Sequence, residues 1–212
     1  LAFAYGADAR LMVMSGLSST IDTLFAPGKG ILAADESAES ADEKRLKPNG
    51  IKTGPAMRRK FRDLLLSAPG IGSYVSGVIL HEETLSQDAD DGTSFPELLT
   101  TRGIVPGIKV DQGTEPFPDH EGEVITNGLV GLSERLAVFH KDHGTGFTKW
   151  RAVIRIEGDH LPSAQAIVEN AKRLASYACE VQRAGMVPIL EPEILLDGTH
   201  SRLRSRQVME TT

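Results

Sequence analysis

Ionisable residues interrupt three short apolar runs of this chain as pairs spaced two positions apart. The pairs are Lys109 with Asp111, Lys149 with Arg151, and Glu191 with Glu193. Apolar runs of this length are typical of buried strands, where an unpaired charge is costly. Side chains two positions apart on a strand share a face. We therefore expect several strands to direct lysine, arginine and carboxylate groups toward one place.

A fourth apolar run, Gly30–Ser37, ends in Asp35 and a neighbouring glutamate. Lysine and arginine bind phosphate, and crowded carboxylates and lysines shift one another's pKa values, which suits acid–base catalysis. Buried lysines also indicate carbonyl chemistry through a Schiff base. The set predicts an anionic substrate and proton transfer.

Each of these residues also has a structural interpretation. Lys149 and Arg151 would then form salt bridges to a neighbouring helix, although burying such charges is costly. The glutamates 191 and 193 would be a solvated strand end, and Asp35 would cap the helix that follows it.

Composition narrows the class of protein. The chain has 212 residues and a net charge of −6 without a basic block, which argues against nucleic-acid binding. Its single cysteine, Cys179, allows no disulfide within the chain, which favours a reducing, cytoplasmic compartment, and we expect it to be a small buried residue. No run approaches the ~18 apolar residues of a membrane span.

Metal ligands and nucleotide loops are not indicated. Among six histidines only His140 and His143 have helical spacing, and there is neither a His-Glu-x-x-His motif nor a cysteine pair. Gly28-Lys29-Gly30 lacks the spacing of a phosphate loop and leads into a strand. We expect no metal and no cofactor.

Periodicity predicts alternating strands and helices. The expected strands are Gly30–Asp35, Val75–Leu80, Val105–Val110, Lys149–Ile156 and Val187–Ile194. The expected helices are Ser18–Phe25, Met57–Leu66, Pro96–Thr101, Leu132–His140, Ser163–Arg183 and Arg202–Glu210. In the second helix, the spacing of Phe61, Leu64 and Leu65 places them on one face.

This alternation implies right-handed βαβ units and a parallel sheet. A barrel and a doubly wound sheet both fit it, but no Gly-x-Gly-x-x-Gly follows the first strand, and the polar strand ends favour the barrel. Only 18 residues follow Ile194, so we expect five of eight strands of a (β/α)8 TIM barrel. Residues 1–17 are expected to be a loose arm, and 18–212 the incomplete barrel domain.

Six motifs, in order along the chain, closely resemble class I fructose-bisphosphate aldolase from about Leu24 to near the C-terminus. They are Gly28–Ser37, Gly77–Leu85, Val105–Asp111, Lys149–Arg151, Pro162–Ala164 and Glu191–Leu195. The resemblance implies a TIM barrel that reversibly cleaves fructose 1,6-bisphosphate into dihydroxyacetone phosphate and glyceraldehyde 3-phosphate. It further implies a metal-independent enzyme with a phosphorylated sugar as its partner, often a homotetramer.

The resemblance also implies roles for individual residues. Asp35 would handle the proton of the hydroxyl next to the cleaved bond, and Glu191 would be the acid–base in imine formation, with Lys149 beside it. Glu193 would position these groups and Arg151 would support the charge balance. Phosphate-binding residues at the 6-phosphate end would be Lys109 and Ser37, with Ser40 and Arg45. The segment 38–44 departs from the family in length and composition.

The family's Schiff-base lysine lies in a Lys-Pro-Asn triplet on the sixth strand, and strands seven and eight hold the 1-phosphate. We expect none of these in the chain, because it supplies only the first five strands. A Lys47-Pro48-Asn49 triplet does occur, but it stands in an early polar turn and is expected to be a coincidence. The span alone is therefore expected to be inactive. Two alternatives stay open: an imine aldolase that uses Lys149 as nucleophile, and a non-catalytic aldolase-derived protein that binds sugar phosphate or partners.

Overall fold

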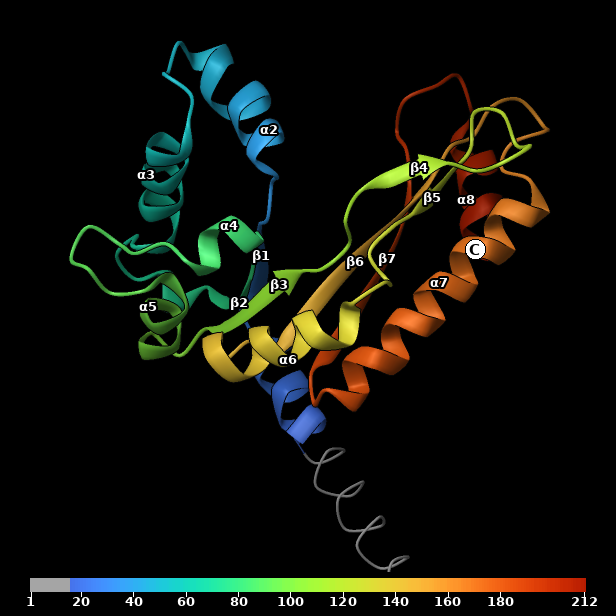
Figure 1. Ribbon diagram of the computed structural model, residues 1–212. Helices are drawn as coiled ribbons and strands as arrows, with labels where there is room; N and C mark the ends of the chain where they lie inside the picture. The colour runs from blue at the N-terminus through green and yellow to red at the C-terminus, as the bar shows by residue number, and fades with distance from the viewer. Residues whose placement is uncertain (1–15) are drawn as a thin grey trace, which may run out of the picture.

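The computed structural model describes residues 16–212, which form a curled, parallel, five-stranded sheet with helices along its outer face (Figure 1). The strand order is β1-β2-β3-β6-β7. The strands are β1 (Gly30–Ala34), β2 (Val75–Leu80), β3 (Val105–Lys109), β6 (Phe147–Ile154) and β7 (Val187–Ile194). The five predicted strands are confirmed, and the order of a partial barrel follows from consecutive right-handed crossovers.

The predicted helices are also present, with small shifts at their ends. The α-helices are α2 (Ala38–Ala41), α3 (Pro55–Leu66), α4 (Glu82–Leu85), α5 (Phe95–Thr101), α6 (Leu132–His143), α7 (Ala164–Arg183) and α8 (Arg202–Thr211). Residues 16–24 are helical as well. Ser163 caps α7 by accepting a hydrogen bond from the Ala166 amide.

The two faces of β6 show how the sheet is built. Thr148 and Trp150 point outward, where the Thr148 hydroxyl bonds the Tyr177 hydroxyl of α7 at 2.6 Å and Trp150 packs on the same ring. Phe147 points inward and belongs to a separate inner cluster. The two-residue period of a strand therefore sorts helix-facing residues from residues that face the barrel interior.

The inner cluster closes one end of the curled sheet. Phe147 packs there with Leu17 and Leu24 of the first helical segment. Gly107, on the neighbouring strand, leaves room for the ring, because a Cβ at this position would lie 2.3 Å from Phe147 Cζ. The opposite end of the inner face, at the carboxyl ends of the strands, carries the ionisable residues.

Two segments were not anticipated. A hairpin of β4 (Thr114–Pro116) and β5 (Val124–Thr126) extends beyond β3 (Figure 1). A π-helical turn over Asp42–Leu46 follows α2 and leads into a 3-10 turn over Lys47–Asn49. The Lys47 side chain lies at the surface in an ion pair with Glu43, as expected for a polar turn.

Helix α3 buries a different face from the apolar one that its leucines define. Leu64 is 73% exposed, whereas Arg58 and Arg62 are buried. The reason is electrostatic: Arg58 pairs with Asp42 and Glu83, and Arg62 pairs with Glu36. The expectation for Cys179 was wrong too, because this residue is exposed on α7.

The last two residues of the expected arm, Gly16 and Leu17, belong to the first helical segment, and Leu17 is buried in the inner cluster. The remainder of the arm lies outside the described residues. Within 16–212, no helix is long and apolar enough to cross a membrane.

Candidate active site

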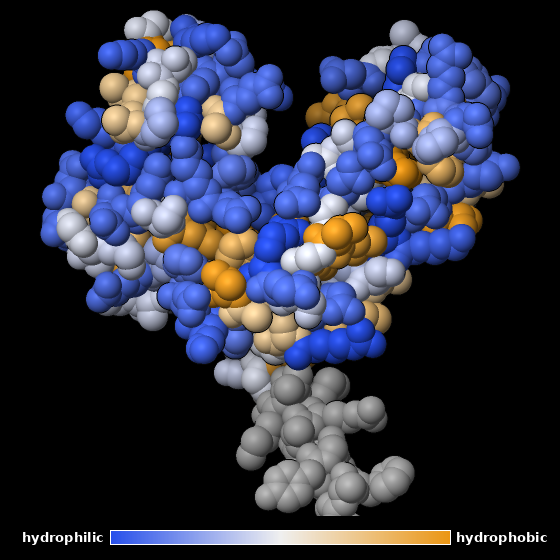
Figure 2. Space-filling model, viewed as in Figure 1, coloured by the Kyte–Doolittle hydropathy of each residue, from blue (hydrophilic) through white to orange (hydrophobic). Residues whose placement is uncertain are grey.

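All nine residues proposed for the site line one cleft of about 720 Å³ at the carboxyl ends of the strands. They are Asp35, Ser37, Ser40, Arg45, Lys109, Lys149, Arg151, Glu191 and Glu193. Figure 2 shows the molecule hollowed between the part that carries α2 and α3 and the part that carries β4, β5 and α8. The site is thus built from strands β3, β6 and β7 and the segment that follows β1.

Lys149 occupies the centre of this cleft. Its Nζ lies 2.8 Å from Asp35 Oδ2 and 3.3 Å from Glu191 Oε2. Burial disfavours the charged amine, but the two carboxylates outweigh burial and raise the pKa of Lys149. The Lys149 amine is therefore an ammonium ion at neutral pH. Its partners lie directly after β1 and on β7, so the alternative interpretation, a salt bridge to a neighbouring helix, does not apply to Lys149.

Arg151 and Glu193 form a second ion pair, across β6 and β7. The hydrogen bond from Arg151 to Glu193 raises the pKa of the guanidinium further above its usual range. The backbone amide of Arg151 also donates to the buried carboxylate of Asp111 at 3.3 Å. The glutamates are therefore partners of cations and do not form a merely solvated strand end.

Asp111 also holds Lys109, whose Nζ donates to Asp111 Oδ1 at 2.5 Å and to its carbonyl at 3.1 Å. The Lys109 side chain remains 21% exposed and faces the cleft. The Lys109 ammonium is thus held in position by Asp111, and its exposed side is available to an anionic ligand in the cleft.

The turn after β1 supplies the remaining polar wall. The Ser37 hydroxyl caps α2 by accepting from the Ser40 amide at 3.2 Å, so Asp35 is not the cap. Arg45 donates from Nε to Glu36 Oε1 at 2.9 Å. The π-helical turn accommodates one more residue per turn than an α-helix and places Arg45 and Lys44 against the cleft.

Four charged or titratable residues of the cleft wall are absent from the proposed set: Glu36, Lys44, His81 and Asp111. Two of them had a signal in the sequence. Asp111 shares the i, i+2 spacing with Lys109, and His81 follows β2 as Asp35 follows β1. The positions of Lys44 and Glu36 depend on the π-helical turn and on packing against α3. No local sequence pattern predicts either feature.

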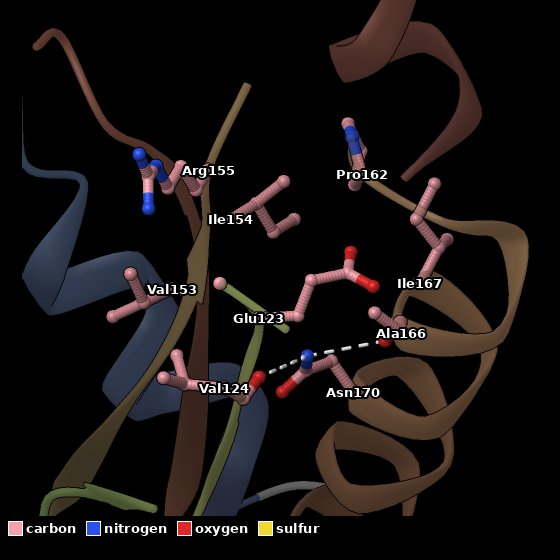
Figure 3. Close-up of a pocket in the computed structure, with 10 residues that line it drawn as sticks. Glu123, Val124, Val153, Ile154, Arg155, Pro162, Ala166, Ile167 and Asn170 are labelled. Carbon is pink, nitrogen blue, oxygen red and sulfur yellow. Dashed lines mark hydrogen bonds between the residues drawn. The ribbon is translucent and has the colours of Figure 1, made fainter. Parts of the chain in front are cut away.

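A second cavity lies between β5, β6 and α7 (Figure 3). Its volume is about 20 Å³, enough for roughly one water molecule. Asn170 there donates to the carbonyls of Val124 and Ala166, and Glu123 accepts from the amide and hydroxyl of Ser163. These bonds join the hairpin to α7, and the space is too small for a sugar phosphate.

No group of three or more histidine, cysteine or acidic side chains within residues 16–212 is arranged to hold a metal ion. A curled parallel sheet with ionisable groups on its inner face defines a partial (β/α) barrel. These groups lie at the carboxyl ends of the strands, where enzymes of this fold place their active sites.

Comparisons with known proteins specify the family. The chain belongs to the class-I fructose-bisphosphate aldolases, a family described as glycolytic, which matches residues 16–212. It is 51% identical to fructose-bisphosphate aldolase C-B of Danio rerio over 195 residues, 92% of this chain and 53% of that protein. It is 44% identical to the probable class 1 aldolase of Xanthomonas axonopodis pv. citri over 201 residues, 95% of this chain and 59% of that protein.

A solved structure agrees in fold. The aldolase of Plasmodium falciparum, crystallised with TRAP and a small-molecule inhibitor, superposes with a TM-score of 0.89 at 40% identity. The match covers 94% of this chain and 57% of that one. The chain thus spans somewhat more than half the length of the relatives it matches. Family membership and the partial barrel, both expected from the sequence, are confirmed.

Proposed function

We propose that this span supplies the acid–base and 6-phosphate part of a site for reversible aldol cleavage of fructose 1,6-bisphosphate. The observation that carries the proposal is the convergence of nine side chains, from three strands and the segment after β1, on a single cleft. Family membership supports the reaction class. The cations of the cleft suit a phosphorylated sugar, and the ion-paired carboxylates suit proton transfer.

The reaction needs a base for the hydroxyl next to the bond that breaks. Asp35 Oδ2 lies 2.8 Å from Lys149 Nζ, and this carboxylate would accept that proton. Glu191 lies on the other side of Lys149 and would exchange the proton that imine formation and hydrolysis require. Glu193, paired with Arg151, would position this pair of strands.

The electron sink is the imine of a lysine, which the resemblance assigns to a sixth strand. Lys149 is a poor substitute as nucleophile, because an amine must be deprotonated to attack a carbonyl and its two carboxylate partners raise its pKa. Borohydride reduction of the chain with dihydroxyacetone phosphate, followed by peptide mapping, tests this assignment. We expect no label on Lys149; a label there would establish the imine-aldolase alternative.

A second experiment assays the 212-residue chain for cleavage of fructose 1,6-bisphosphate, with triose phosphate release coupled to a dehydrogenase. It tests whether this span binds the sugar phosphate without completing the reaction. We expect binding of sugar phosphate without turnover. Full aldolase activity from the chain alone would overturn the proposal. Failure to bind any sugar phosphate would overturn the proposed 6-phosphate site as well, and would leave only the partner-binding form of the non-catalytic alternative.

For the protein that contains this span we propose the cytoplasm and a homo-oligomer, often a tetramer in this family. A single cysteine supports a reducing compartment. The homo-oligomer is what the family resemblance implies. Within the described residues β1 and β7 each pair on one side only, and these edges are where the further strands of the barrel would pair. Sedimentation of the protein isolated from its source tests the assembly, and a monomer would contradict it.

A further inference from the structure

His81 completes a row of side chains across the mouth of the curled sheet. In the strand register, Ala34 of β1 pairs with Leu80 of β2, and Leu80 pairs with Ile108 of β3. The next residue on each strand is therefore level with the other two: Asp35, His81 and Lys109. Two of these three belong to the proposed site, and His81 stands between them.

The alternation of side chains along β2 places His81 on the inner face of the sheet. Ile79, two residues earlier, lies in the inner cluster, whereas Leu80 belongs to the outer core. Side chains alternate between faces along a strand, so His81 points to the barrel interior. It lines the same cleft as Lys109 and Arg45.

The backbone fixes which ring nitrogen carries the proton. The Glu83 amide donates to His81 Nδ1 at 3.3 Å, so Nδ1 is the acceptor and caps α4. In a neutral imidazole the other nitrogen is then the donor. Nε2–H makes no hydrogen bond within residues 16–212, so it is free to donate to a molecule bound in the cleft.

The surroundings of the ring favour this neutral form. Burial lowers the pKa of His81, and the positive charges of Lys109 and Arg62 lower it further, against a smaller opposing effect of Glu83 and Glu82. Lys109, which lines the same cleft, also makes the space beside His81 attractive to an anion.

We propose that His81 is a substrate-binding residue whose Nε2–H donates a hydrogen bond to an oxygen of the 6-phosphate of the bound sugar, beside Lys109. This inference rests on the proposed sugar-phosphate site. It gives the residue after β2 a phosphate contact like those proposed for Ser37, in the segment after β1, and for Lys109 of β3.

Two substitutions separate this role from helix capping. His81→Asn keeps an acceptor that caps α4, because asparagine is a favoured cap, but it is too short to replace Nε2–H. His81→Gln loses the favoured cap and keeps an N–H donor at about the reach of Nε2. If His81 only caps α4, His81→Asn should affect sugar-phosphate binding less than His81→Gln does. If His81 binds the phosphate, His81→Asn should weaken binding more than His81→Gln does.

Calorimetric titration of the full chain with fructose 6-phosphate measures the contact. We expect His81→Asn to weaken binding about 10- to 100-fold, the range for a hydrogen bond to a charged group, and His81→Gln to weaken it less than about threefold. Long-range ¹H–¹⁵N spectra should show the Nε2–H tautomer in the free protein and a shift of Nε2 on binding.

Each outcome decides a different claim. If the unmodified chain binds no fructose 6-phosphate, the proposed function fails and this inference fails with it. If the chain binds and His81→Asn binds equally well, only the role of His81 is overturned. An Nδ1–H tautomer, or a loss of affinity that His81→Gln shares in full, overturns it too.

Discussion

The Lys149 ammonium lies 2.8 Å from the Asp35 carboxylate, although strands β2 and β3 stand between their strands in the sheet. Adjacent strands are about 4.8 Å apart, so a flat sheet would hold these groups much further from each other. The contact exists because the sheet curls and its inner face becomes concave. The curl that begins a barrel is therefore what assembles the cleft.

Lys149→Met should uncover a contribution to stability that persists to high pH. Because its folded pKa is raised, the ion pair stabilises the fold fully below about pH 10.4, the usual lysine value, and is lost as pH rises through the higher folded pKa. Urea unfolding at several pH values should show a constant difference in the free energy of unfolding between the variant and the wild type. This difference should narrow only above that pH. Lys172→Met, on the exposed face of α7, should show no such change; a gap that already narrows near pH 8 would contradict the assignment.

Arg62→Met should be one of the more damaging single substitutions outside the apolar core. Arg62 is 3% exposed and pairs with Glu36, and removing one partner of a buried pair costs about 3–5 kcal/mol. The matched control is Arg59→Met on the same helix. Arg59 pairs with the exposed Asp90, so the loss should stay within about 1 kcal/mol. Equal effects of the two substitutions in urea unfolding would contradict this account of α3.

The cost of Arg62→Met should also depend on pH in the acid range. Burial alone would raise the pKa of Glu36, but Arg62 and Arg45 outweigh burial and lower it. Its contribution is present above about pH 4.3, the usual glutamate value, and is lost as pH falls through the folded pKa. The difference in the free energy of unfolding between the variant and the wild type should narrow below that pH. A difference that widens on acidification would show that the ion pair with Glu36 is not the interaction that Arg62 contributes.

Gly107→Ala should destabilise the closed end of the sheet by about 1–3 kcal/mol, the usual cost of overpacking a core. The new Cβ would meet the Phe147 ring at 2.3 Å, and the ring is fully buried. Gly30→Ala is the matched control, since it begins β1 and has nothing within 4 Å of an added Cβ. Thermal unfolding compares the two, and a neutral Gly107→Ala would mean that Phe147 moves freely.

Local patterns predicted the five sheet strands and the charged residues at their ends, because a charge inside an apolar strand is costly and therefore conspicuous. Ser37, Ser40 and Arg45 have no such pattern, and only the family resemblance indicated them. Phe147, two residues before the predicted start of β6, was missed because a buried aromatic residue suits a loop-to-strand junction as well as a strand.

Features that depend on tertiary pairing were not predictable. The face that α3 buries depends on Glu36, Glu83 and Asp42, which lie far from it in sequence. Strands β4 and β5 have three residues each, too few for a two-residue period to register. His81 was left out of the predicted site because it follows an apolar strand without interrupting it. Its place after β2 matches that of Asp35 after β1, and the register with Asp35 and Lys109 shows why that matters.

The central claim is that the inner face at the carboxyl ends of the strands binds a sugar phosphate. Calorimetric titration of the chain with fructose 1,6-bisphosphate, in the wild type, Lys109→Met and Lys172→Met, tests it most directly. We predict saturable binding that Lys109→Met weakens about 10- to 100-fold, as expected for loss of a charged hydrogen bond, while Lys172→Met binds like the wild type. Absence of binding, or equal binding by all three proteins, would contradict the account.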